Sequence, residues 1–171
     1  MTDYPIAPQS KPFVAMTVVT SALPLALVWA ARLAPSPVRE LLYGAAAFVV
    51  VLYVAIAVLM RPILFSLSKD GIELVWPTRR RRVPLEGVVR ARVLDPKELR
   101  RETGYAMRVG AGGFLGAFGW AMTGKGTMEL WVTRTDKVVF VERRDGKSLL
   151  ITPAQPERFV EELTSLLGRA E

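Results

Sequence analysis

The sequence predicts an α+β membrane protein, in which a transmembrane helical hairpin precedes an antiparallel β-barrel or sandwich of about seven strands capped by a C-terminal α-helix. The chain of 171 residues is 51% hydrophobic, and two long uncharged runs lie before residue 61. Short segments of alternating apolar and polar residues follow, and an amphipathic segment comes last. We therefore divide the chain into an N-terminal tail (1–12), a hairpin (13–61) and a globular domain (62–171).

The stronger predicted span covers residues 40–60. No charge occurs from Leu41 to Met60. A helix of that length extends about 30 Å, the thickness of the hydrocarbon core of a bilayer. Buried helices of soluble proteins rarely lack a polar stripe over such a length, so we predict that this helix crosses a membrane.

The first predicted span covers residues 13–33. It is uncharged from Phe13 to Ala31 and contains Pro24, which is tolerated in membrane helices. A cleaved signal peptide is the alternative, although Lys11 is the only basic side chain ahead of the run.

The connection from Leu33 to Glu40 is short, so the two helices should be antiparallel neighbours. Lysine and arginine are more frequent on the side of the globular domain than in this connection. The positive-inside rule then predicts a multi-pass protein of the cell (inner or plasma) membrane with both termini in the cytoplasm.

The globular domain shows the two-residue period of β-strands. We predict strands over 63–68, 72–76, 83–85, 88–93, 127–133, 138–143 and 148–152. Lys69–Gly71 and Asp145–Gly146 are turn signals. Pro156–Leu167 predicts the final helix, with Gly168 ending it.

Three segments of the domain are predicted to be non-strand. The run from Arg79 to Arg82 is interpreted as a basic loop, and residues 95–102 as a loop or helical turn. The glycine-rich stretch from Ala106 to Met122 is too short for a third span. It is expected to be an apolar loop that folds under the barrel or touches the bilayer.

Several classes of chemistry are disfavoured by composition. Histidine and cysteine are both absent, which removes the commonest general base, the commonest metal ligand and the thiolate nucleophile. The Gly119–Lys125 stretch has the spacing of a phosphate-binding loop, but Gly126 stands where Ser or Thr is needed. We predict no catalytic residues, no metal and no cofactor.

The net charge of +7 favours anionic partners. The densest basic cluster is the candidate contact with lipid headgroups or a protein partner, and it consists of Arg79, Arg80, Arg81 and Arg82. A solvated loop is the competing interpretation. Nucleic acid is not expected, because no recognition helix or ladder of stacking aromatic residues accompanies the arginines.

The globular part resembles bacterial PH-like (pleckstrin-homology-like) domains. The resemblance rests on the stretches 68–72, 83–88, 112–119, 126–127, 138–141, 145–146, 151–153 and 156–159 and covers roughly residues 62–167. It implies a bent antiparallel barrel or sandwich with a helix at one end. In phosphoinositide-binding PH domains the first β-turn is rich in basic residues, whereas here that turn is only Lys69–Gly71.

Our leading hypothesis from the sequence is a membrane-tethered, non-catalytic binding or scaffolding module that recruits a protein partner at the cytoplasmic face. Direct sensing of anionic lipid headgroups through the basic cluster is the alternative. A second alternative is an accessory subunit of a membrane enzyme or transport complex.

Overall fold

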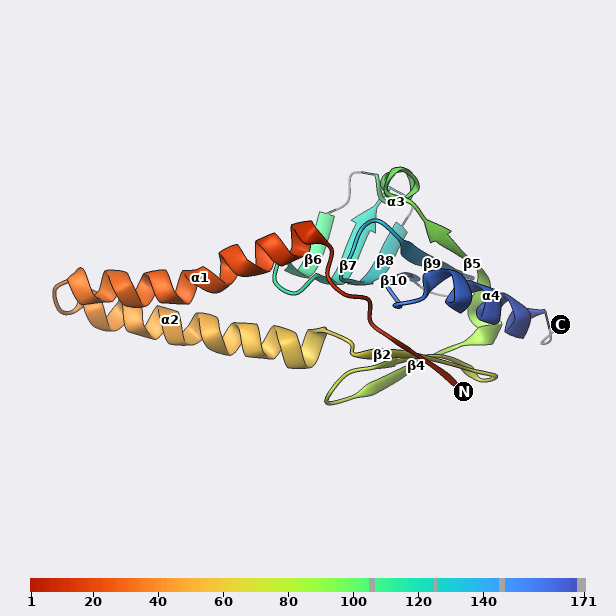
Figure 1. Ribbon diagram of the computed structural model, residues 1–171, viewed down its shortest axis with the longest axis horizontal. Helices are drawn as coiled ribbons and strands as arrows, with labels where there is room; N and C mark the ends of the chain where they lie inside the picture. The colour runs from red at the N-terminus through yellow and green to blue at the C-terminus, as the bar shows by residue number, and fades with distance from the viewer. Residues whose placement is uncertain (105–106, 125, 145–146, 169–171) are drawn as a thin grey trace.

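The computed structural model describes residues 1–104, 107–124, 126–144 and 147–168. A long helical hairpin projects from a domain of two β-sheets, as Figure 1 shows. Two short helices and a C-terminal helix complete the domain. The predicted Asp145–Gly146 turn lies outside the described residues.

The hairpin consists of α1 (Lys11–Leu33) and α2 (Val38–Ala55), and a π-helical turn, η1 (Ile56–Met60), extends α2. Both candidate spans are long and apolar enough to cross a membrane, and almost none of their length is buried within the protein. Val19, Leu25 and Leu41 each expose about 70% of their surface. A core helix of a soluble protein would be mostly covered, whereas the rest of this chain leaves both helices uncovered.

The first sheet has four antiparallel strands in the order β1 (Thr2–Pro5), β2 (Leu64–Ser68), β3 (Gly71–Val75) and β4 (Arg80–Pro84). Strand β1 comes from the segment expected to be a tail. It pairs with β2, so the whole hairpin is an insertion between two adjacent strands of one sheet. Its short length and terminal proline concealed it from pattern analysis.

The second sheet has six strands in the order β5-β9-β10-β8-β7-β6. Their bounds are β5 (Val88–Leu94), β6 (Met107–Gly112), β7 (Ala117–Thr123), β8 (Gly126–Val132), β9 (Val138–Arg143) and β10 (Ser148–Ile151). Strands β8 and β10 run parallel, so the expectation of a purely antiparallel domain was wrong for this pair. The described residues form ten strands rather than about seven.

Two segments interpreted as loops are strands. Arg80–Arg82 belong to β4, because edge-strand side chains can remain solvated while the backbone pairs with β3. The described part of the glycine-rich stretch forms the β6–β7 hairpin. Gly110 and Gly119 lie opposite each other there with positive φ, and a Cβ on either would clash with the backbone of the other strand. Glycine is therefore required by close strand pairing, not by a loop.

The main hydrophobic core lies between the two sheets. Helix α4 (Pro156–Leu167), with the predicted bounds, inserts Phe159 and Leu163 into it. The outer face of the second sheet carries a second cluster, against which Leu99 of α3 (Pro96–Thr103) and Phe13 of α1 pack. A 3₁₀ turn, η2 (Leu85–Gly87), connects the two sheets. Both faces of the six-stranded sheet are thus partly covered.

The N-terminal segment joins both sheets. Beyond the β1–β2 pairing, the Ala7 amide donates to the Thr152 carbonyl at 2.8 Å, and the Ser10 amide donates to the Thr133 carbonyl at 3.1 Å. Tyr4 is 3% exposed, and its ring meets Phe159 edge-on at 5.2 Å. Its hydroxyl donates to Glu162 of α4.

Replacing the Tyr4 ring should destabilise the domain. We expect Tyr4→Ala to lower the free energy of unfolding by about 3 kcal/mol, because it leaves a cavity beside Phe159. Tyr4→Phe keeps the ring and should cost only about 1.5 kcal/mol for the bond to a carboxylate. Thermal unfolding of the purified full chain measures both, and equal losses would show that the ring does not pack as described.

Alkaline pH should weaken the same contact. Burial, followed by the hydrogen bond to Glu162, raises the pKa of Tyr4 from 10.0 to about 12. A group with a raised pKa stabilises the fold fully below its unfolded value and loses that contribution as pH rises through the folded value. The stability advantage of the unmodified chain over Tyr4→Phe should therefore shrink between pH 10 and 12. An advantage that stays constant over this range would contradict the contact.

Candidate functional site

The predicted arginine cluster lies on the edge strand β4 and in the turn before it. Because successive side chains of a strand point to opposite faces of the sheet, the arginines of β4 do not all face the same way. Arg81 stands opposite Leu74, whose side chain is in the core, so Arg81 points between the sheets. Arg80 and Arg82 point to the outer face, as does Glu73.

Arg81 forms a bidentate ion pair with a carboxylate of the opposite sheet. Its guanidinium donates to both carboxylate oxygens of Glu129 on β8, at 2.7 and 2.9 Å. The Glu129 side chain is 5% exposed and also accepts a long bond from the Trp131 indole. This pairing joins the two sheets, and it satisfies a carboxylate that would otherwise be buried without a counter-charge.

The outward-facing arginines also have acidic neighbours. Arg80 lies 3.6 Å from Glu73, and Arg82 lies 3.9 Å from both Glu73 and Asp70. Arg79 differs, because it stacks over Trp76 at 4.7 Å and donates to the Leu59 carbonyl at the end of the hairpin. Three of the four predicted contact residues are thus partly neutralised within the domain. The sequence could not show this for Arg81, because Glu129 is far away along the chain.

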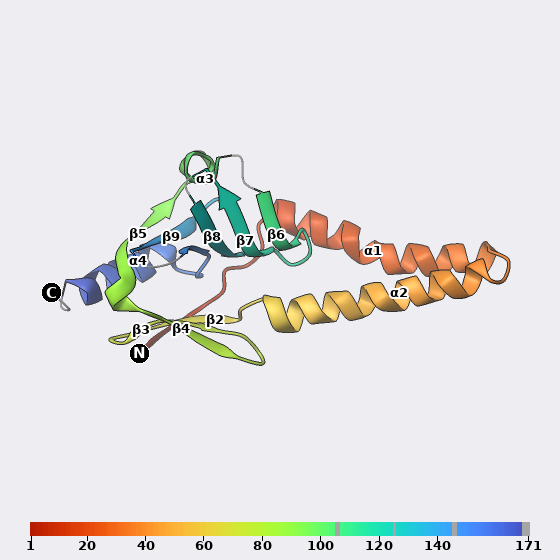
Figure 2. The ribbon, with the colours of Figure 1, turned by 180° about the vertical axis from the view of Figure 1, so that it is seen from behind.

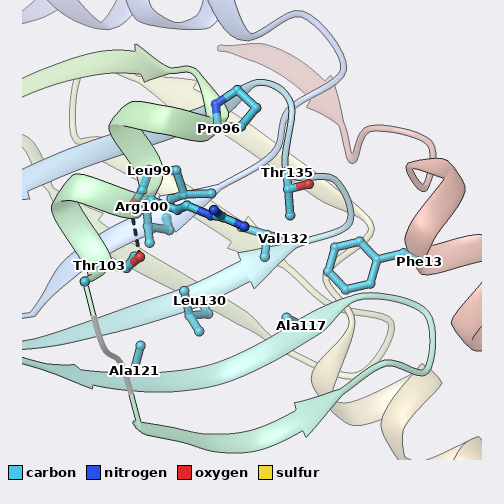
Figure 3. A pocket seen from close by; sticks show the side chains of 12 residues that line it. Phe13, Pro96, Leu99, Arg100, Thr103, Ala117, Ala121, Leu130, Val132 and Thr135 are labelled. Carbon is cyan, nitrogen blue, oxygen red and sulfur yellow. Dashed lines mark hydrogen bonds between the residues drawn. The ribbon is translucent and has the colours of Figure 1, made fainter.

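A pocket of about 370 Å³ lies on the outer face of the six-stranded sheet. Figure 3 shows helix α3 on one side, the sheet as its floor and Phe13 of α1 at its far end. The floor is apolar and includes Ala117 and Ala121, whose small side chains leave the space open. The pocket was not predicted from the sequence, because β7, which supplies Ala117 and Ala121 to its floor, was interpreted as part of a loop.

Helix α3 is fixed by local and tertiary contacts. Asp95 caps its first turn, accepting from the amides of Lys97 and Glu98, while the Glu98 side chain accepts from the Asp95 amide. Near its end, Glu102 pairs with Arg92 on β5. These contacts hold the helix over the sheet and keep the pocket open.

The pocket combines an apolar floor with an arginine side chain from α3. Arg100 lies on α3 at the pocket, as Figure 3 shows, and its side chain forms no ion pair with any described residue. The Thr103 hydroxyl donates to the Leu99 carbonyl, and Thr135 adds a second hydroxyl to the lining. The arrangement suits an apolar group attached to an anion.

A third feature lies at the base of the hairpin. The β6–β7 turn, residues 113–116, contacts both helices: the Leu115 amide donates to the Thr17 hydroxyl of α1 at 2.9 Å, and Phe114 stacks on Tyr53 of α2 at 4.2 Å. Leu115 holds a φ of 62°, an unfavourable conformation for leucine that this docking stabilises. A Cβ on Gly113 would press against Met16. The turn therefore joins the domain to the helices at a third point, in addition to the two chain connections before α1 and after η1.

Acidic side chains are dispersed in the structure. Within the ranges that the structure describes, no group of three or more histidine, cysteine, aspartate or glutamate residues could hold a metal ion. The stretch with phosphate-loop spacing begins within β7 and ends just before β8, and its Lys125 lies outside the described residues.

The globular domain matches a known protein family. A family model described as Bacterial PH domain matches residues 64–167. Comparisons with curated proteins and with solved structures found no match. The matched range contains β2 to β10 and α4, but neither β1 nor the hairpin.

The pairing pattern predicts unequal effects of three arginine substitutions. Arg81→Ala should lower the free energy of unfolding by about 2–3 kcal/mol, because Glu129 would remain buried without its cation. Arg80→Ala and Arg82→Ala should each cost less than about 0.5 kcal/mol, because their pairs are long and exposed. Denaturant unfolding of the full chain compares them. Equal effects would contradict a structural role for Arg81.

Proposed function

The chain belongs to the bacterial PH domain family, and we propose that it is a membrane-tethered, non-catalytic binding module that recruits a protein partner at the cytoplasmic face of the cell membrane. PH domains are generally binding folds, which supports a binding or scaffolding role. The fold alone does not define the partner, so the proposal depends on the features of this chain.

One observation carries the proposal: the candidate membrane hairpin is inserted between paired strands β1 and β2. A domain attached by a flexible linker could tumble above the bilayer. Here the chain leaves one strand, forms both helices and returns to the adjacent strand, as Figure 1 shows. The domain is thereby held in one orientation at the surface from which the helices enter.

The same insertion supports the proposed sidedness. Because β1 and β2 pair, the ends of the hairpin lie on one side of any membrane that both helices cross. Removal of α1 as a signal peptide would also remove buried Tyr4 from the core, which argues against cleavage. The basic residues near the domain then favour the cytoplasm for both termini.

The pocket beneath α3 is the proposed site of recruitment. Its size falls within the usual range of ligand pockets, roughly 300–1,000 Å³. An apolar side chain next to a carboxylate, at the end of a protein or in an acidic segment, would match the alanine-lined floor and Arg100. Phe13 places this site beside the first turn of α1, within reach of a partner at the membrane.

Direct lipid sensing remains the second candidate function, now centred on Arg79. Arg80, Arg81 and Arg82 have acidic partners, which weakens their attraction for headgroups. Arg79 lies at the end of the hairpin and makes no salt bridge with a described residue. A headgroup contact by this residue would assist tethering more than recognition.

Recruitment is tested by photo-crosslinking in native membranes followed by affinity capture of the full chain. Arg100→Glu reverses the charge at the pocket and should reduce capture of a specific partner at least tenfold. Arg101→Glu makes the same change at the next position of α3, outside the pocket, and should leave capture unchanged.

The outcome separates the two candidate functions. Equal capture by both variants would reject the pocket as the site, and the absence of any reproducible partner would reject recruitment. Binding of the full chain to anionic vesicles that is lost with Arg79→Ala would favour lipid contact.

A further inference from the structure

One face of the β6–β7 hairpin exposes a continuous group of large apolar side chains. We call it the β6–β7 apolar face, and it consists of Met107, Val109, Trp120 and Met122. Their exposed fractions are 65%, 41%, 42% and 47%. Met107 pairs with Met122, and Val109 pairs with Trp120, so the four side chains are direct neighbours on one side of the sheet.

This exposure is not scattered surface hydrophobicity. By strand alternation, Phe118 points to the same side as Trp120, and Phe118 is buried between the sheets. The apolar face therefore continues the interior surface beyond the cover of the four-stranded sheet. Strand β6 is also a sheet edge, with backbone groups not paired to another described strand. Contiguous exposed apolar surface of this kind marks a contact with a partner or a membrane.

The position of strands β6 and β7 next to the helical hairpin indicates what covers the β6–β7 apolar face. The turn between β6 and β7 contacts Thr17, six residues into α1, and Tyr53, seven residues before the end of η1. At 1.5 Å per residue, the turn reaches about 9 Å beyond the domain-side ends of the helices. In Figures 1 and 2, β6 is the strand of its sheet nearest to α1, and β7 and β8 lie successively farther from the helices. If the helices span a bilayer, strands β6 and β7 lie at the surface of that bilayer.

The side chains suit the boundary between headgroups and hydrocarbon. Tryptophan is enriched at that level because its ring is apolar and its indole N–H is polar. The Lys147 ammonium lies 5.1 Å from the centre of the Trp120 ring, so an aliphatic stem and a cation accompany the aromatic residue. Methionine and valine add surface that lipid would cover.

We propose that the β6–β7 apolar face contacts the lipid bilayer at headgroup level and forms a third membrane contact besides the two helices. The inference rests on the proposed membrane tether. It adds that the domain lies against the bilayer with one defined edge, which leaves the opposite sheet edge, β5, in water.

The test uses the full chain in lipid nanodiscs containing phosphatidylcholine and phosphatidylglycerol. The chain has no cysteine, so a single introduced cysteine can carry a nitroxide label. Met107→Cys and Met122→Cys report on the apolar face. Val89→Cys is the matched control, because Val89 is an apolar residue of β5 with 48% exposure at the other edge of the sheet. Phe48→Cys, on α2, is the membrane reference.

Collision rates with oxygen and with a water-soluble nickel complex measure the depth of each label. We expect oxygen to be favoured at least threefold more strongly at Met107→Cys and Met122→Cys than at Val89→Cys. Equal, aqueous values at all three positions, with Phe48→Cys in the membrane, would overturn the lipid contact and leave the tether intact. An aqueous value at Phe48→Cys would instead overturn the tether. Dipolar broadening at Met107→Cys would assign the face to a second copy of the chain and reject the bilayer.

Discussion

The first ten residues connect every major part of the structure. Strand β1 completes the four-stranded sheet, Tyr4 packs on α4, and the amides of Ala7 and Ser10 bond to the ends of β10 and β8. This segment then continues directly into α1. One short stretch of chain therefore pairs in the first sheet, packs between the sheets and leads into the helical hairpin.

The attachment of the hairpin is stronger than two covalent connections would provide. Both connections are anchored: α1 follows a segment bonded to both sheets, and the Met60 carbonyl at the end of η1 accepts from the Trp76 indole at 3.0 Å. The turn containing Phe114 adds contacts to both helices. The helices are therefore connected to the four-stranded sheet through Trp76 and to the six-stranded sheet through the β6–β7 turn. Phe13, in the first turn of α1, lines the pocket beneath α3.

The sequence predicted the elements whose pattern of apolar and polar residues is distinctive. The two helices of the hairpin were recognised by their long uncharged runs, and the segment Pro156–Leu167 by its amphipathic period. The hairpin of β6 and β7 was missed because glycine usually signals a loop, whereas Gly110 and Gly119 permit close pairing here. The candidate site was predicted only in part. Arg79–Arg82 were found as a basic cluster, but local sequence does not contain the distant carboxylate of Glu129.

The insertion of the hairpin between β1 and β2 also dictates an order of events during synthesis. Thr2–Pro5 leave the ribosome before either helix, and their partner strand follows only after both. If the helices span a membrane, as proposed, and the second helix failed to insert, β1 and β2 would be left on opposite sides of that membrane and the sheet could not close. Closure of the four-stranded sheet would then depend on insertion of both helices, because a chain that crossed the membrane only once would leave Tyr4 and Phe65 without their packing partners in the core.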